Sequence, residues 1–241
     1  MDKRKSIFEI LGENRFLHIL LSILLGFLVG AVFLLAMKLS VGEAYGRLIS
    51  SVVSLKGFSY VVVYAIPYIM AGLSVAFSFK TGVFNIGAEG QYVVGSMAAC
   101  CMSIFGSGLP KPLLIPLCFL AAMAAGALWG IIVGFLKTKW GINEVLSMIM
   151  FNWIAFYLSN FIAGLPAIKN EGNAEATRNI AANASTLFSK DLISSLGLCP
   201  TANWGIFVAI AMTVLVWFII EKTTLGYELK AVGSNNFAAP V

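Results

Sequence analysis

Long apolar runs separated by short polar segments dominate this chain. A helix needs roughly 20 apolar residues to cross a hydrocarbon layer of about 30 Å. Runs near this length recur along the sequence, and the alternating pattern typical of a membrane β-strand is missing. The pattern predicts an all-α, polytopic transmembrane protein. About six spans are expected, at residues 16–37, 59–77, 91–105, 112–136, 145–165 and 204–220.

Composition supports a membrane location. Of the 241 residues, 59% are hydrophobic and 11% are charged, whereas soluble domains carry about 25% charged residues. The mean hydropathy is +0.91. The polar start MDKRKS followed by an apolar run resembles a signal peptide, but the run is longer than the apolar core of such a peptide and further spans follow. We therefore expect an uncleaved first helix.

The placement of lysine and arginine predicts an orientation. Cytosolic ends of membrane spans carry an excess of these residues. With the N-terminus in the cytosol, about nine of the 16 Lys and Arg residues lie inside. The net charge of +5 suits anionic lipid headgroups, and because no basic cluster is interleaved with aromatic residues, nucleic acid is not an expected partner.

A polar, glycine-rich stretch, KTGVFNIGAEGQ at residues 80–91, interrupts the apolar pattern. Its three glycines disfavour a continuous helix, since each costs about 1 kcal/mol relative to alanine. The run after it is short for a crossing, so we expect a broken or re-entrant element near residues 80–105. Such breaks are tolerated at membrane depth where they line a cavity, and in transporters they flank the substrate site.

Side chains of this stretch are candidates for contact with a solute. Asn85, Glu89 and Gln91 would offer hydrogen bonds. Phe84, and Trp153 in a later run, would offer surfaces on which a planar solute such as a nucleobase could stack. An ordinary cytosolic loop is the alternative, with Glu89 at the positive end of the helix that follows. Both interpretations stay open on the sequence alone.

A second polar group accompanies the run at residues 145–165. Asn143 and Glu144 stand before it, where an N-cap and a first-turn acid are favoured. Asn152 lies inside the run, and an amide in an apolar helix needs hydrogen-bond partners. Asn152 therefore either joins helices or lines the solute pathway.

No catalytic motif is evident in the sequence. It lacks a GxxxxGK[ST] phosphate loop, a nucleophile elbow and a pair of histidines at metal spacing. The four cysteines show neither metal-ligand spacing nor a disulfide framework. We expect no enzyme activity, metal or cofactor, and any use of ATP would need another chain.

Three segments resemble the permease subunits of ATP-binding-cassette (ABC) importers. Within that class they are similar to the branched-chain amino acid and simple-sugar group, and specifically to its nucleoside-type subgroup. The resemblance begins near residue 61 and runs to the last residue. The segments are GVFNIGAEGQYVVGSMAA (82–99), NEVLSMIMFNWIAFYLSN (143–160) and TTLGYELKAVGSNNFAA (223–239).

The resemblance implies a set of partners in a bacterial plasma membrane. These are a second permease subunit, two ABC ATPase subunits on the cytosolic face, and an extracytoplasmic substrate-binding lipoprotein. The third segment matches the family's coupling motif within a cytosolic coupling segment at 221–241, which implies a short helix docking on the ATPase. The matching residues are Gly226, Glu228, Ala231, Gly233, Asn236 and Ala238.

A permease for a small polar solute, with nucleosides preferred, is what the resemblance implies. A simple sugar such as ribose is the alternative within the class.

Other solutes and other classes of protein are less well supported by the sequence. Charged solutes are disfavoured because the spans contain no arginine. An ion-coupled secondary transporter would need acids within the spans, and only Glu89 and Glu144 come near. An embedded enzyme or scaffold lacks paired catalytic groups. Since family members continue further, the chain is expected to be the N-terminal portion of a longer permease.

Overall fold

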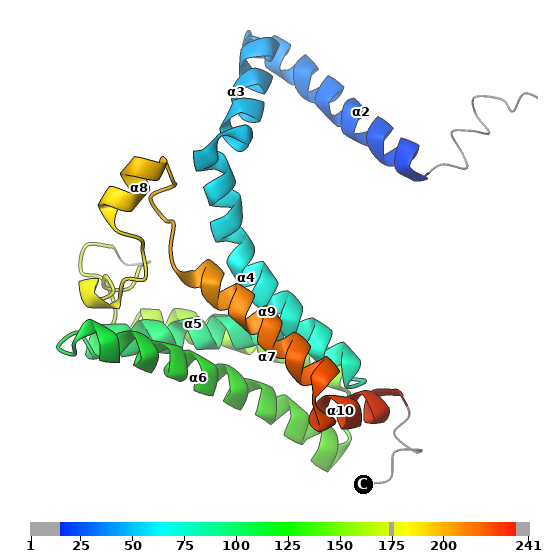
Figure 1. Ribbon diagram of the computed structural model, residues 1–241, viewed down its shortest axis with the longest axis vertical. Helices are drawn as coiled ribbons and strands as arrows, with labels where there is room; N and C mark the ends of the chain where they lie inside the picture. The colour runs from blue at the N-terminus through cyan, green and yellow to red at the C-terminus, as the bar shows by residue number, and fades with distance from the viewer. Residues whose placement is uncertain (1–14, 174–175, 235–241) are drawn as a thin grey trace, which may run out of the picture. The chain divides into compact units, whose positions relative to one another are not determined.

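The computed structural model describes residues 15–173 and 176–234 (Figure 1). Helices dominate this part of the chain, and its strand-like pairing is limited to two isolated bridges, Lys169 with Thr177 and Leu187 with Asn203. The all-α prediction is confirmed. The pattern of contacts divides the chain into two units, residues 1–58 and 59–241.

The first unit contains two helices that contact each other, α2 (Arg15–Ala36) and α3 (Val41–Val53). Ser40 caps α3, because its hydroxyl oxygen accepts a hydrogen bond from the Glu43 N–H at 3.4 Å. The Tyr45 hydroxyl donates to the Phe27 carbonyl at 2.5 Å, and the two rings meet edge to face with centroids 5.2 Å apart. Tyr45 thereby joins α3 to α2.

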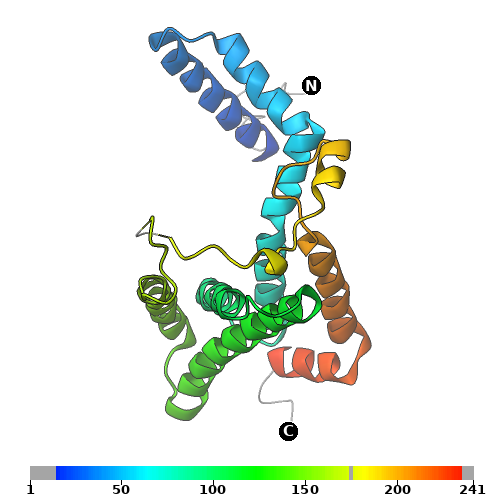
Figure 2. The same ribbon diagram turned by 90° about the vertical axis from the view of Figure 1, so that its left-hand side faces the viewer.

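The second unit is built around three packed helices. Helix α5 lies against both α6 and α7, and the latter two also touch each other (Figure 1, Figure 2). Helix α4 begins at the end of the first unit and continues into the second. The helices of this unit are α4 (Leu55–Lys80), α5 (Ala88–Phe105), α6 (Lys111–Trp140), α7 (Glu144–Ala163), α8 (Lys190–Leu196), α9 (Gly205–Lys222) and α10 (Thr224–Ser234).

Five helices of the described chain are long and apolar enough to cross a membrane. They coincide with five of the six predicted spans, with ends that differ by a few residues. The spans are Phe16–Ala36, Leu55–Lys80, Lys111–Trp140, Glu144–Ala163 and Gly205–Lys222.

The sixth predicted span, at 91–105, is helix α5, which is not among the helices that are long and apolar enough to cross a membrane. It has 18 residues, or roughly 27 Å of helix. Its first turn holds Glu89 and Gln91, and glycine and serine are its buried residues. Because α5 packs on α6 and α7, small residues that allow close approach replace the long apolar side chains of a lipid-facing helix.

The break expected near residues 80–105 falls at residues 81–87. Helix α4 ends at Lys80 in a turn where Gly82 has a φ of 75°, a value that glycine adopts without strain. Helix α5 then runs unbroken from Ala88, three residues before the start of the predicted span. Residues 81–87 are called the polar turn below.

The connection between α6 and α7 follows local capping rules. Gly141, with a φ of 64°, ends α6 in the left-handed conformation. The Asn143 side-chain oxygen accepts the N–H groups of Val145 at 2.9 Å and Leu146 at 3.2 Å, and Glu144 lies in the first turn. The predicted N-cap and first-turn acid are confirmed.

The segment between α7 and α9 packs on the turn between α5 and α6. The Asn183 side chain donates to the carbonyls of Ser107, at 3.2 Å, and Leu109. The Ala181 N–H donates to the Ser103 hydroxyl at 3.1 Å. This connection is therefore attached to the helix bundle through the Asn183 side chain and the Ala181 backbone.

Candidate functional site

Asn85 organises the polar turn. Its Oδ1 accepts the Gly87 N–H at 2.9 Å, and its Nδ2 donates to the Ser74 hydroxyl oxygen at 3.3 Å. The first bond closes a local turn of the kind that asparagine favours, and the second ties the turn to α4. The side chain is only 9% exposed. Both of its hydrogen bonds thus hold the turn in one conformation.

Asn152 holds the start of α5 from the neighbouring helix α7. Its Oδ1 accepts the Gly90 N–H at 2.9 Å, and its Nδ2 donates to the Ile86 carbonyl at 3.1 Å. The N–H groups in the first turn of a helix have no partner within the helix, and the N-cap residue of α5, Gly87, has no side chain to supply one. Asn152 serves as this cap, which favours its role in joining helices.

A cavity of about 590 Å³ adjoins the polar turn. Its walls come from the end of α4, the polar turn, α5, α6, α7 and one residue of α10. The volume is within the range of roughly 300–1,000 Å³ typical of small-molecule pockets. Its polar lining residues include Ser78, Thr81, Asn85, Gln91, Lys137, Thr138 and Glu144.

Two of the six predicted pathway residues, Asn85 and Gln91, line this cavity. The Asn85 side chain already forms hydrogen bonds with Gly87 and Ser74. Gln91 is half-buried, and within the described residues its side-chain amide forms no hydrogen bond. It lies against Gly130 of α6, where a Cβ would overlap its Nε2.

The other four predicted pathway residues lie outside the cavity lining. Asn152 contacts the start of α5. Phe84 and Trp153 are 46% and 58% exposed, and Trp153 stacks on Tyr157 with ring centroids 6.2 Å apart. Glu89 is exposed and has no ion pair with any described residue. Whether these side chains meet a solute stays a prediction.

The cavity also contains an ion pair that sequence reasoning missed. Lys137 Nζ and Glu144 Oε1 are 2.9 Å apart, and their side chains are 39% and 24% exposed. Lys137 lies near the end of α6 and Glu144 at the start of α7. Opposite charges at the ends of two consecutive apolar runs could have indicated this pair in the sequence.

Trp129 was also missed; its Nε1 is buried and has no hydrogen-bond partner among the described residues. An aromatic residue within an apolar run gives no such signal.

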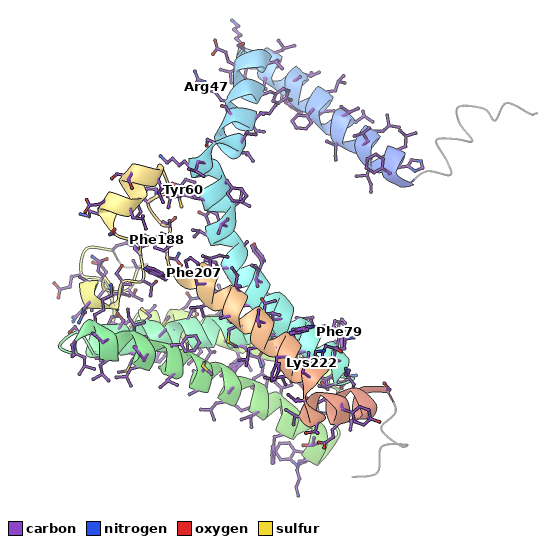
Figure 3. The ribbon with its side chains drawn as sticks, in the orientation of Figure 1. Arg47, Tyr60, Phe79, Phe188, Phe207 and Lys222 are labelled. Atoms are coloured by element: carbon purple, nitrogen blue, oxygen red, sulfur yellow. The ribbon has the colours of Figure 1, made fainter. Side chains whose placement is uncertain are left out.

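Helix α10 contacts the polar turn through backbone atoms. A Cβ on Gly233 would overlap the Lys80 carbonyl oxygen and lie 2.9 Å from the Gly82 nitrogen. From the other side, a Cβ on Gly82 would lie 3.0 Å from the Gly233 Cα. Both glycines are therefore required for this close approach. Figure 3 labels Phe79 and Lys222, which mark the end of the molecule where α10 lies.

The junction between α9 and α10 depends on Gly226. Its N–H donates to the Thr223 hydroxyl oxygen at 3.1 Å, which caps α10, and a Cβ at this position would overlap the Ile219 carbonyl oxygen. Lys230 of α10 pairs with Glu221 of α9 at 3.1 Å. Gly226 and the ion pair together set the direction in which α10 leaves α9.

The remaining residues of the predicted coupling motif divide between α10 and the undescribed end of the chain. Ala231 is half-buried, whereas Glu228 and its neighbour Tyr227 are exposed. Asn236 and Ala238 lie outside the described residues.

The tight contact at Gly90 gives a first testable prediction. A Cβ there would lie 2.8 Å from Asn152 Oδ1 and 3.1 Å from Trp129 Nε1, so Gly90→Ala should force α5 and α7 apart and cost about 1–3 kcal/mol. Gly72→Ala on α4 is the matched control because its Cβ meets nothing within 4 Å. The measurement is the unfolding midpoint of the full-length protein in detergent. Equal midpoints for the two variants would contradict the packing described here.

Comparison with known proteins identifies the family. Residues 57–241 match the family described as branched-chain amino acid transport system / permease component. The chain belongs to this family. It is a multi-pass membrane permease component, as the resemblance of its three segments to ABC importer permeases implied.

Three curated relatives align with nearly the whole chain. The guanosine ABC transporter permease protein NupP of Bacillus subtilis is 37% identical over 224 residues, 91% of this chain and 62% of the relative. The nucleoside permease protein NupB of Lactococcus lactis is 36% identical, over 90% of this chain and 60% of the relative. A glucose permease protein of Haloferax volcanii is 35% identical, over 91% and 58%. The chain thus spans about three-fifths of the length of these relatives. No solved structure matches it.

Proposed function

We propose that this permease is a membrane-spanning subunit of an ABC importer that takes up a small polar solute, most nearly a nucleoside. The observation that carries the proposal is its 36–37% identity to a guanosine and a nucleoside permease over about nine-tenths of the chain. A simple sugar is the alternative, supported by the 35% identity to a glucose permease.

The proposed partners are those of an ABC import system. A second permease subunit completes the pathway, two ABC ATPase subunits hydrolyse ATP, and an extracytoplasmic lipoprotein delivers the solute. The sequence has no phosphate-binding loop of its own, which supports a separate ATPase subunit. In the proposed orientation the N-terminus and α10 are on the cytosolic side of a bacterial plasma membrane.

Helix α10 is the proposed contact with the ATPase. Its Gly233 rests on the end of α4 and the polar turn, and its Gly226 rests on the end of α9, whereas Tyr227 and Glu228 are exposed for a partner. ATP binding would favour one state of the importer if the ATPase binds α10 more tightly in that state. The proposed coupling residues are Gly226, Glu228, Ala231, Gly233, Asn236 and Ala238.

The proposed solute pathway passes the cavity beside the polar turn. Asn85 and Gln91 line this cavity, whereas Asn152 is proposed to act by positioning the start of α5. Phe84, Glu89 and Trp153 lie on exposed surfaces, and we propose that they meet the pathway only once the second permease subunit is in place.

An ion-coupled carrier is less well supported. Of the two acids near membrane depth, Glu144 is paired with Lys137 at 2.9 Å. Binding a transported cation there would first require breaking this pair. Glu89 remains as the acid to test if an ion gradient drives uptake.

The decisive experiment purifies the full-length permease from its native membrane in mild detergent. We expect mass spectrometry to find an ABC ATPase subunit in the preparation, and we expect ATP to drive [³H]guanosine uptake after reconstitution with the lipoprotein. Uptake of [¹⁴C]glucose alone would support the sugar alternative. A preparation without an ATPase subunit, with uptake driven by an ion gradient, would refute the proposal.

The exposed acid of α10 gives a second testable prediction. Glu228→Gln removes the charge without changing the packed face of the helix, so ATP-driven uptake should fall several-fold while the amount of permease in the membrane is unchanged. Glu171→Gln, an exposed position in the connection after α7, is the control. Normal uptake by the Glu228→Gln variant would show that this carboxylate has no part in coupling.

A further inference from the structure

Gln91 presents an unpaired amide to the cavity. No described residue bonds its side chain, although the residue is half-buried and borders the cavity. Gly130 leaves the space that this side chain occupies, since a Cβ at Gly130 would overlap the Gln91 Nε2. This amide borders the cavity without a protein partner, so it has donors and an acceptor available for a ligand.

Apart from the Trp129 indole, whose buried Nε1 has no hydrogen-bond partner among the described residues, the other polar side chains of the lining are already paired within the protein. Asn85 bonds Ser74 and Gly87, and the Thr138 hydroxyl donates to the Gly134 carbonyl at 3.0 Å. The charges of Lys137 and Glu144 neutralise each other. The lining therefore includes the free Gln91 amide, the unpaired Trp129 N–H and no unpaired charge among its described residues, which favours an uncharged polar ligand over an anion or a cation.

Apolar and aromatic side chains supply the rest of the wall. Trp129 and Phe151 both line the cavity, with their rings edge to face and centroids 5.4 Å apart. Val232 of α10 lines it too, next to the Gly233 contact with the polar turn. A ligand in the cavity would thus touch aromatic rings and the helix proposed to meet the ATPase.

We propose that this cavity is a binding site for an uncharged polar solute, with the Gln91 amide as its hydrogen-bonding group and α10 as one wall. The inference rests on the proposed function and assigns its solute to a defined place in this chain. The solute would occupy the site at the α10 end of the pathway, and movement of α10 would change one side of the site.

The test measures equilibrium binding to the full-length permease in complex with its ATPase, without the lipoprotein. [³H]Guanosine and [¹⁴C]glucose are the two probes, which separate the two candidate solutes. Gln91→Leu should weaken binding of the bound probe about tenfold, because the amide is lost. Asn160→Leu, which replaces another side-chain amide with leucine at an exposed position of α7, should bind as the wild type does.

A second variant tests the site independently if Gln91→Leu does not fold. Gly130→Ala keeps Gln91 but displaces its amide, so it should also weaken binding, whereas Gly72→Ala should not. Unchanged affinity in a correctly assembled Gln91→Leu or Gly130→Ala complex would overturn the site. Failure of the wild-type complex to bind either probe, when the complete importer takes one of them up, would also overturn it. Failure of the complete importer to take up either probe would instead reject the proposed function.

Discussion

Gly233→Ala is expected to lower ATP-driven uptake more than tenfold while leaving the permease in the membrane. The added Cβ would overlap the Lys80 carbonyl oxygen and lie 2.9 Å from the Gly82 nitrogen and 3.0 Å from the Thr81 carbonyl carbon. All three are backbone atoms, so no side chain can rotate away and α10 itself must move. That movement would displace the exposed face that we propose meets the ATPase.

Uptake and ATP hydrolysis should be measured together in proteoliposomes that contain the complete importer. For Gly233→Ala we expect hydrolysis to continue with little uptake, which is the signature of uncoupling. Gly72→Ala is the control, since it adds the same atom in open space. A Gly233→Ala importer that moves as much solute per ATP as the wild type would refute the proposed role of this contact.

The opposite side of the contact provides an independent check. Gly82→Ala would place a Cβ 3.0 Å from the Gly233 Cα, at a φ of 75° that alanine rarely adopts. The same loss of coupling is therefore expected from a residue on another segment. If only one of the two variants is uncoupled, the defect lies in that segment and not in the contact between them.

Asn152→Leu is expected to have the largest effect on stability. It would leave the N–H of the buried Gly90 and the carbonyl of the half-buried Ile86 without their present partners, and an unsatisfied buried group costs about 1–3 kcal/mol. The unfolding midpoint of the full-length protein in detergent should fall clearly below that of the wild type. Asn160→Leu, the same exchange at an exposed position, should change it little.

Substitutions of Asn152 also distinguish the two roles that the sequence left open for it, which are joining helices and contacting the solute. Asn152→Asp keeps an acceptor for the Gly90 N–H but has no donor for the Ile86 carbonyl when ionised, so its stability should lie between those of the wild type and Asn152→Leu. A variant with normal stability and assembly that fails only in uptake would instead place Asn152 in contact with the solute.

Much of the local structure was predictable because it depends on residues close together in the chain. Apolar run lengths located five membrane-spanning helices, and the three glycines at 82–90 indicated the break at 81–87. Asn143 caps α7 as expected, since capping needs only an oxygen two or three residues before an N–H group. The coupling motif predicted a short helix after the last span, which is α10, but not what Gly226 and Gly233 contact.

The arrangement of the helices was decided only by tertiary structure. Asn152 meets Gly90, Gln91 occupies the space left by Gly130, Lys137 pairs with Glu144, and α10 rests on the polar turn. Each of these contacts depends on how far a helix is rotated and shifted along its neighbour. In a soluble helix the apolar stripe shows which face is buried, whereas here lipid and protein interior are both apolar and the stripe is missing. The sequence therefore determined where the helices and the polar turn lie along the chain, and tertiary packing determined which polar groups are left free to bind a solute.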